Sequence, residues 1–275
     1  MAIRTDLAAE LRSLKGEHQG IAHKELSFGE IKIERTHIIN NEGAKHLGKP
    51  PGRYVTLSFS RFTPDDIEGD LHTAIKNELS ELLGEKSSIL LAGLGNKRIT
   101  PDAFGPLAAE GVFATRHIEK ALAKSLGLGE LKSVEVITPG VLGQTGIEAA
   151  ELIKAAADAT RPDAVIVLDA LAAGALERVG TTVQLSASGI CPGSGVGNAR
   201  REISEKTLGI PVIAIGIPTV VDASSLLEDK TTEKMMVTPR DIDSMIKYSA
   251  KAVSHAINCA LQPNTPKSTL LALGF

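Results

Sequence analysis

The sequence has few aromatic residues: it contains no tryptophan and two tyrosines, and aromatic side chains make up 3% of the chain. Proteins that hold single-stranded nucleic acid stack the bases on aromatic rings, and such a surface is disfavoured here. The net charge of −3 implies no general attraction to nucleic acid or to an anionic membrane. We therefore expect neither nucleic acid nor a membrane as a direct partner.

Cysteines and long apolar runs are also scarce. The two cysteines, Cys191 and Cys259, lack the spacing of a metal site, although the sequence also allows a disulfide between them. The first residues show no apolar signal segment, and the longest apolar runs, such as 165–168, have the length of a strand. These absences predict a reduced cytoplasmic protein.

Strand and helix patterns alternate from residue 88 onward. Strands are predicted at 88–94, 134–137, 164–168, 182–185 and 212–217, and helices at 101–125, 147–159 and 239–261. Crossover helices of this length connect parallel strands, so we predict one α/β domain over 1–275, with a mostly parallel sheet and helices on both faces. Residues 181–185 alternate in polarity, which places them toward a sheet edge, with an antiparallel orientation left open.

Residues 1–50 are polar and show weak periodicity. Ile31, Ile33 and Ile38 alternate with charged residues, which predicts a short half-exposed strand or hairpin that packs on or extends the α/β core. A strand at 53–59 and an amphipathic helix at 65–83 follow. The four histidines of this segment lack the tight spacing of metal ligands, so we interpret them as surface residues.

A carboxylate is predicted where the strand at 88–94 ends. Gly93 and Gly95 form a tight turn, Thr100 is a good helix N-cap, and Asp102 falls in the first helical turn, where the helix dipole favours the ionised carboxylate. Ligands gather at this edge of open α/β sheets. Stabilisation of the helix start explains Asp102 equally well at this point.

Asp169 is placed in the same way. It follows the apolar run 165–168 and precedes small residues, so a strand end is predicted at the same edge of the sheet. Two neighbouring carboxylates either share a proton for acid–base attack by water or hold a metal ion. Alternatively, Asp169 caps the turn that follows the strand.

Two glycine-rich turns complete the set of candidate segments. In 138–148, Thr145 and Glu148 have the spacing of a capping box, which explains both without catalysis, while the glycines permit a substrate to approach. In 188–198, Asn198 stands where a dinucleotide fingerprint needs Gly or Ala, and the Lys-Ser/Thr ending of a P-loop is missing. Backbone N–H groups of this turn would suit an oxyanion hole or an extended peptide.

In combination, these segments resemble the germination protease family of spore-forming bacteria. The resemblance covers most of the chain in the family's order, through IRTDLA at 3–8, GRYVTL at 52–57, GLGN at 93–96, TPDA at 100–103, TRH at 115–117, PGV at 139–141, TGIE at 145–148, DALAA at 169–173, PGSGVGN at 192–198, LGIPVIAIGIPTVVDA at 208–223 and MVTP at 236–239.

The resemblance implies an endopeptidase of an atypical aspartic type, in which Asp102 and Asp169 are essential and no metal or cofactor is expected. It implies a fold like that of the hydrogenase-maturation endopeptidases, a homotetramer, and a place in the spore core. The implied substrates are small acid-soluble spore proteins, cut at a short acidic motif. Glu148 and the turn residues Gly193, Ser194, Gly195 and Asn198 are then expected to line the site and orient the peptide.

Three features depart from the family. The family is made as a zymogen, but only Met1 and Ala2 precede the residues that follow its pro-segment, so we expect a chain in its mature form. A long family insertion between 223 and 236 is reduced to about a dozen residues. Cys191 stands where the family commonly has histidine, and we interpret it as tuning the site.

Two other functions remain open from the sequence. One is a metal-dependent endopeptidase, with Asp102, Asp169 and His117 as ligands. The other is a non-catalytic module that binds peptide or phosphate through its glycine-rich turns. Within the aspartic hypothesis, the assignment of acid and base also stays open, because coupled carboxylates titrate as a pair.

Overall fold

The central strands of the sheet run parallel because helices connect them. The structure is a computed structural model that describes residues 5–225 and 235–274. The strand order is β1-β2-β3-β7-β8-β6-β4-β5, and β9 pairs with β8. The strands are β1 (Ile21–Phe28), β2 (Ile31–Ile38), β3 (Gly52–Ser58), β4 (Ser88–Gly93), β5 (Ser133–Ile137), β6 (Ala164–Ala173), β7 (Thr182–Ser186), β8 (Val212–Asp222) and β9 (Met236–Val237).

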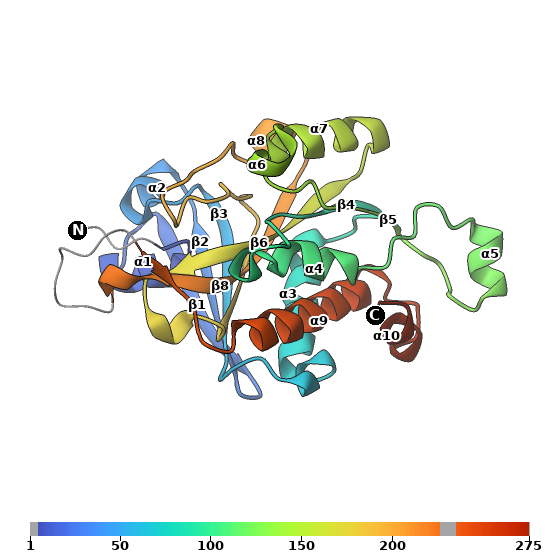
Figure 1. Cartoon of the computed structure of the whole chain (residues 1–275), viewed down its shortest axis with the longest axis horizontal. Coiled ribbons are helices and arrows are strands. Elements are labelled where there is room, and N and C mark those ends of the chain that lie inside the picture. The colour runs from blue at the N-terminus through green and yellow to red at the C-terminus, as the bar shows by residue number, and fades with distance from the viewer. Residues whose placement is uncertain (1–4, 226–234, 275) are drawn as a thin grey trace.

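Helices cover both faces of this sheet, as predicted. On one face, α3, α4 and α9 pack against strand residues such as Leu91 and Ile166, and on the other α7 and α8 pack against Leu90 and Val165 (Figure 1). The helices are α1 (Ala8–Lys15), α2 (Asn41–Leu47), α3 (Asp70–Leu83), α4 (Phe104–Glu110), α5 (Lys120–Ser125), α6 (Leu142–Thr145), α7 (Ala149–Thr160), α8 (Glu205–Leu208), α9 (Ile242–Leu261) and α10 (Lys267–Gly274). Short 3₁₀ helices lie at Pro64–Ile67, Thr100–Asp102, Leu176–Arg178 and Ala223–Ser225.

The α/β fold class is confirmed. Strands β5, β4, β6 and β8 are parallel to their neighbours within this group. Successive residues of a strand point to opposite faces, which is why Leu90 and Leu91 belong to different cores. A strand buried on both faces reads as a continuous apolar run, and that run is what the sequence showed.

The polar N-terminal segment extends the sheet. Strands β1, β2 and β3 form an antiparallel meander, and β3 pairs antiparallel with β7. The expectation that 181–185 lies toward an edge is therefore wrong, because β7 is flanked by β3 and β8. Its polar Gln184 is buried because it accepts a hydrogen bond from the backbone N–H of Ala8 and donates one to the carbonyl oxygen of Asp6.

The predicted helix at 101–125 is broken. The chain forms a 3₁₀ turn, then α4 and α5, with irregular structure between Glu110 and Lys120. The side chain of Asn258 on α9 accepts a hydrogen bond from the N–H of Phe113 and donates one to the carbonyl of Gly111. Because these bonds already give the backbone groups of Gly111 and Phe113 their partners, a continued helix would add no hydrogen bonds for them.

The predicted start of the last helix is also wrong. Helix α9 begins at Ile242, after an N-cap at Asp241, and not at Pro239. Thr238 does not cap it, because the Thr238 hydroxyl donates to the carbonyl of Thr219 on β8. The predicted helix at 65–83 is likewise divided, into the 3₁₀ turn at Pro64–Ile67 and α3.

Two expectations fall outside the described residues. The one on the pro-segment concerns the residues before Ile3, and most of the shortened insertion lies in 226–234. Within the described part of the chain, no helix is long and apolar enough to cross a membrane.

Candidate active site

A cavity of about 610 Å³ lies at the carboxyl ends of the parallel strands. The segments that follow β4 and β5 line it, together with the last residues of β6 and β8. Both predicted aspartates line this cavity, and Glu148, Gly193 and Asn198 line it with them. The structure thus brings five of the seven predicted site residues to one cavity.

Asp169 lies inside strand β6. The expected strand end at Leu168 is wrong, because β6 continues to Ala173 and Asp169 pairs with Gly216 of β8. The side chain is 5% exposed, and one carboxylate oxygen accepts a hydrogen bond from the N–H of Ala170 at 3.0 Å. Burial raises the pKa of Asp169 well above its usual value, and the charges of Asp102 and Asp6 raise it further.

Asp102 ends the 3₁₀ turn Thr100–Asp102, so Thr100 is the first residue of that turn and not its cap. The Asp102 carboxylate accepts a hydrogen bond from the N–H of Asn96 at 2.7 Å, which ties it to the turn after β4. Burial raises the pKa of Asp102, and the bond from Asn96 opposes that shift. The expected preference of this site for the ionised form is therefore corrected, because desolvation exceeds the favourable local dipoles.

Two glycines allow this arrangement. Gly95 has φ +117°, and a Cβ there would lie 2.0 Å from the carbonyl oxygen of Asp102. Gly105, at the start of α4, lies so close to the sheet that a Cβ would be 2.1 Å from the carbonyl oxygen of Leu94. The 3₁₀ turn and α4 can therefore approach β4 and β6 closely enough for Asp102 to reach the cavity of Asp169.

The electrostatic coupling of the two aspartates determines their chemistry. A negative charge on Asp102 raises the pKa of Asp169 because like charges in a desolvated site repel each other. The pair therefore retains a proton to higher pH than two isolated carboxyls would. One protonated and one ionised carboxyl is the state that acid–base activation of water requires.

Asp6 is a third carboxylate that sequence reasoning did not single out. Its backbone N–H donates to the carbonyl of Ala172, and its side chain accepts from the N–H of Ala172 and from the hydroxyl of Ser194. It lines the aspartate cavity and a second one beside it. The only sequence signal for Asp6 is its place in the segment 3–8 that carries the family resemblance.

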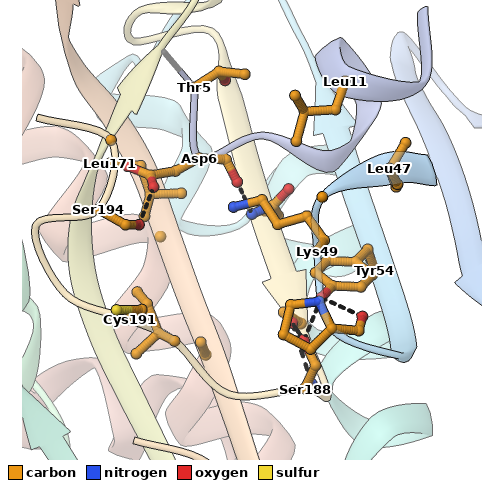
Figure 2. A pocket seen from close by; sticks show the side chains of 18 of the residues that line it. Thr5, Asp6, Leu11, Leu47, Lys49, Tyr54, Leu171, Ser188, Cys191 and Ser194 are labelled. Atoms are coloured by element: carbon orange, nitrogen blue, oxygen red, sulfur yellow. Dashed lines mark hydrogen bonds between the residues drawn. The ribbon is translucent and has the colours of Figure 1, made fainter. Parts of the chain in front are cut away.

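The second cavity has a volume of about 730 Å³ (Figure 2). Figure 2 shows the side chain of Lys49 extending toward Asp6 across this cavity. Burial lowers the pKa of Lys49, while the negative charge of Asp6 opposes that shift. Among the described residues, Lys49 makes no ion pair. The cavity thus contains a partly desolvated amine with capacity to bind an anionic group.

The turn 188–198 is divided between the two cavities. Gly193 and Asn198 line the aspartate cavity, whereas Ser194 and Gly195 line the second one, against Asp6. A Cβ at Gly195 would lie 2.1 Å from a carboxylate oxygen of Asp6, so this glycine permits the close contact. Ser194 and Gly195 therefore hold Asp6 in place.

Cys191 lines the second cavity and its thiol donates to the carbonyl of Arg200. Burial raises the pKa of Cys191, and the charges of Glu202 and Asp6 add to that shift. Because only the thiolate is a strong nucleophile, a raised pKa makes Cys191 less reactive.

The capping box at Thr145 and Glu148 does not form. Thr145 is the last residue of α6, and Glu148 is the N-cap residue of α7, where its side chain makes no capping bond. The Glu148 side chain is thus free of the helix-capping role that the spacing predicted, and it lines the aspartate cavity.

His117 does not lie with the aspartates. It is exposed, it is not among the residues of either cavity, and it belongs to the turn that begins at Thr115, whose N–H bonds to Val134 at the start of β5. The two groups of three potential metal ligands found in the described part of the chain include neither Asp102 nor Asp169. The three-ligand set of the metallopeptidase hypothesis is therefore not assembled.

The chain is similar to a well-defined group of proteins. A family model described as "Germination protease" matches residues 2–233. The germination protease of Caldanaerobacter subterraneus subsp. tengcongensis is 40% identical, with 96% of this chain and 95% of the relative covered. That of Clostridium tetani is 37% identical, with 96% of each chain covered, and that of Bacillus subtilis is 44% identical, with 82% of this chain and 65% of the relative covered.

Among solved structures, a [NiFe] hydrogenase maturation protease, HycI, from Thermococcus kodakarensis KOD1 overlaps 67% of this chain and 98% of its own. The TM-score is 0.41 and the sequence identity is 19%.

Proposed function

The chain belongs to the germination protease family, and on that premise we propose that it is an endopeptidase that hydrolyses small acid-soluble spore proteins during spore germination. The observation that supports a peptidase site most directly is the coupled pair of Asp102 and Asp169 in one cavity. The cellular place that goes with this function is the spore core.

In the proposed mechanism, the ionised carboxyl of the pair takes a proton from a water molecule, whose oxygen attacks the carbonyl carbon of the scissile peptide bond. The protonated carboxyl donates a hydrogen bond to the carbonyl oxygen, where negative charge develops. The C–N bond then breaks as the leaving nitrogen receives a proton from the pair. Which aspartate is acid and which is base stays open, because the pair titrates jointly. No metal or cofactor takes part in this proposal.

The substrate is proposed to lie extended along the aspartate cavity. Glu148, Gly193 and Asn198 line this cavity and would orient the peptide on either side of the aspartates. Ser194 and Gly195 contribute indirectly, since they position Asp6 between the two cavities.

Lys49 supports a substrate with an acidic side chain. The Lys49 amine forms no ion pair with any described carboxylate, and its cavity shares Asp6 with the aspartate cavity, so it would form a charge-assisted hydrogen bond with such a side chain. We propose the second cavity as the subsite for an acidic residue of the cleavage motif.

The test is the replacement of each aspartate by its neutral isostere. Asp102→Asn and Asp169→Asn should each abolish cleavage of a small acid-soluble spore protein while the circular dichroism spectrum stays that of the wild type. Asp158→Asn, on the exposed side of α7, is the matched control and should cleave normally. Near-normal turnover by either aspartate variant would contradict the proposal.

Two further measurements separate the rival functions. A non-catalytic binding module would retain peptide affinity in the double variant and show no turnover in the wild type. A metallopeptidase would lose activity on dialysis against a strong chelator and regain it with a divalent metal ion. If the mechanism is aspartic, the protein molecules that remain folded after dialysis should still cleave the substrate.

A further inference from the structure

Two histidines and a cysteine meet where α3 packs against α9. His72 belongs to α3, and His255 and Cys259 lie one turn apart on α9. Their exposed fractions are 0%, 3% and 4%. None of the three lines either cavity of the candidate active site. The cluster therefore has no part in the peptidase mechanism proposed above.

His72 is the unusual member of this cluster. Both of its ring nitrogens are buried, and within the described part of the chain neither forms a hydrogen bond of regular geometry, although the backbone of His255 lies near enough to raise the pKa of the ring slightly. A buried polar group without a partner has lost its hydration and gained no hydrogen bond in return, which destabilises the fold. Such groups are rare in folded proteins, and an ion at the site is one of their ordinary explanations.

The three side chains have the spacing of metal ligands. One ligand atom from each lies within 4.8 Å of the others, and the Cys259 Sγ is 3.8 Å from the His255 Nε2. With bond lengths of about 2.0–2.3 Å, a tetrahedral zinc ion holds its nitrogen and sulfur ligands roughly 3.4–3.6 Å apart. The rings of His72 and His255 lie with centroids 4.9 Å apart and planes 31° apart, so binding one ion requires at least one ring to rotate until its lone pair points at the ion.

The charge environment leaves the ligand atoms available. Burial lowers the pKa of His72 to about 4, with further contributions from His255, Lys267 and Lys76, and burial also lowers the pKa of His255. A neutral imidazole carries one lone pair on a ring nitrogen, and that nitrogen is the atom that binds a metal ion. Burial raises the pKa of the Cys259 thiol, so a metal ion has to displace that proton. The negative charge of Glu68 raises the pKa of both His255 and Cys259, and the positive charge of Lys267 lowers it.

We propose that His72, His255 and Cys259 bind a Zn²⁺ ion that ties α3 to α9. Imidazole and thiolate are the ligands that zinc prefers, and the ion would satisfy the ring of His72. A water molecule takes the fourth position. The site is structural: it connects two helices that cover the same face of the sheet. This inference does not depend on the peptidase function.

The experiment is metal analysis of the full-length protein, purified without chelators from a zinc-supplemented culture. Mass spectrometry should find about one zinc per chain, the stoichiometry of a single site. Cys259→Ser and His72→Gln should each lose most of that zinc. Cys191→Ser, which removes the other thiol, should retain it. A Co²⁺-substituted protein should show a thiolate-to-cobalt charge-transfer band that is absent from Cys259→Ser.

Stability provides a second measurement for the case in which a variant folds poorly. A chelator should lower the melting temperature of the wild type by several degrees and leave that of Cys259→Ala unchanged, because only a folded protein with the site binds the ion. Absence of zinc after dialysis against zinc salt would overturn the proposal, as would equal zinc in wild type and Cys259→Ser. Zinc lost only from Asp102→Asn and Asp169→Asn would place the metal at the catalytic pair, which would contradict both proposals.

Discussion

At the scale of single residues, the buried carboxyl of Asp169 lowers the stability of the folded protein at neutral pH. Because its folded-state pKa is raised, the folded protein binds the proton more tightly than the unfolded chain does. The contribution of Asp169 to stability is therefore greatest at pH below the unfolded pKa, about 3.9, and falls as pH rises through the folded pKa.

Asp169→Asn should consequently stabilise the protein at neutral pH while it abolishes cleavage. The amide keeps an oxygen that accepts from Ala170 and removes the buried charge. We expect the melting temperature at pH 7 to rise by a few degrees, since about 1 kcal/mol corresponds to roughly 2–4 °C in a domain of 150–250 residues. The gain should shrink as the pH is lowered toward 4, and a variant that melts below the wild type at pH 7 would refute the argument.

Asp163 provides a control of opposite sign. Hydrogen bonds from the backbone N–H and hydroxyl of Ser87 and from the N–H of Ser88 lower its pKa. Asp163→Asn should therefore lower the melting temperature at neutral pH, with an effect that fades as the pH falls toward the pKa.

Lys49 allows a test of substrate recognition. Replacing it by methionine keeps much of the apolar stem and removes the charge, so binding of an acidic side chain should weaken. We expect kcat/KM for a peptide with the acidic motif to fall about tenfold or more, the equivalent of one hydrogen bond to a charged group. The loss should appear mainly in KM, and it should be small for the peptide in which glutamine replaces the acidic residue.

Lys49→Arg is the matched variant for that measurement. It restores the charge and should recover part of the preference for the acidic peptide. If Lys49→Met lowers kcat/KM equally for the acidic and the glutamine peptides, the amine does not read the acidic side chain.

At the scale of elements, the turn after β4 controls where Asp102 lies. Gly95→Ala should displace the 3₁₀ turn, because φ +117° disfavours a side chain and the Cβ would meet the Asp102 carbonyl oxygen. We expect a loss of about 1–3 kcal/mol in the free energy of unfolding. Cleavage should fall more steeply than stability, since Asp102 moves away from Asp169.

Gly143→Ala is the control for this turn. Gly143 also lines the aspartate cavity, but it is helical, with nothing within 4 Å of the position of a Cβ. Urea unfolding should show an equal or slightly higher stability, because alanine favours the helix. If Gly95→Ala is as stable and active as this control, the close packing of the turn is not required.

At the scale of the whole molecule, we expect copies of the chain to assemble into a tetramer. Helix α5 projects from the body of the molecule (Figure 1); its Leu122 is 50% exposed, and Leu126, which caps its C-terminus, is 61% exposed. Exposed apolar surface of this kind is typical of contacts between proteins. Light scattering should give the mass of a tetramer, and replacing both leucines by glutamine should shift it toward smaller species. A wild-type monomer at assay concentration would refute the assembly.

The sequence by itself determined the α/β core and the neighbourhood of the two aspartates. Apolar runs such as 89–91 and 165–168 are long enough to be strands, and their alternation with helices forces parallel pairing. Residues near the carboxyl ends of parallel strands meet at one edge, so Asp102 and Asp169 could be placed together without a structure.

Only the tertiary structure decided which other side chains line the aspartate cavity and the second cavity beside it, and how these cavities are charged. Asp6 and Lys49 come from the N-terminal segment, whose strands add to the sheet through β3 and β7, and local patterns hold no information about such distant contacts. Burial, which raises the pKa of Asp102 against its helix dipole, is likewise a property of the packed molecule. Where segments distant in the sequence pack together, desolvation and long-range hydrogen bonds outweigh the local preferences that the sequence shows.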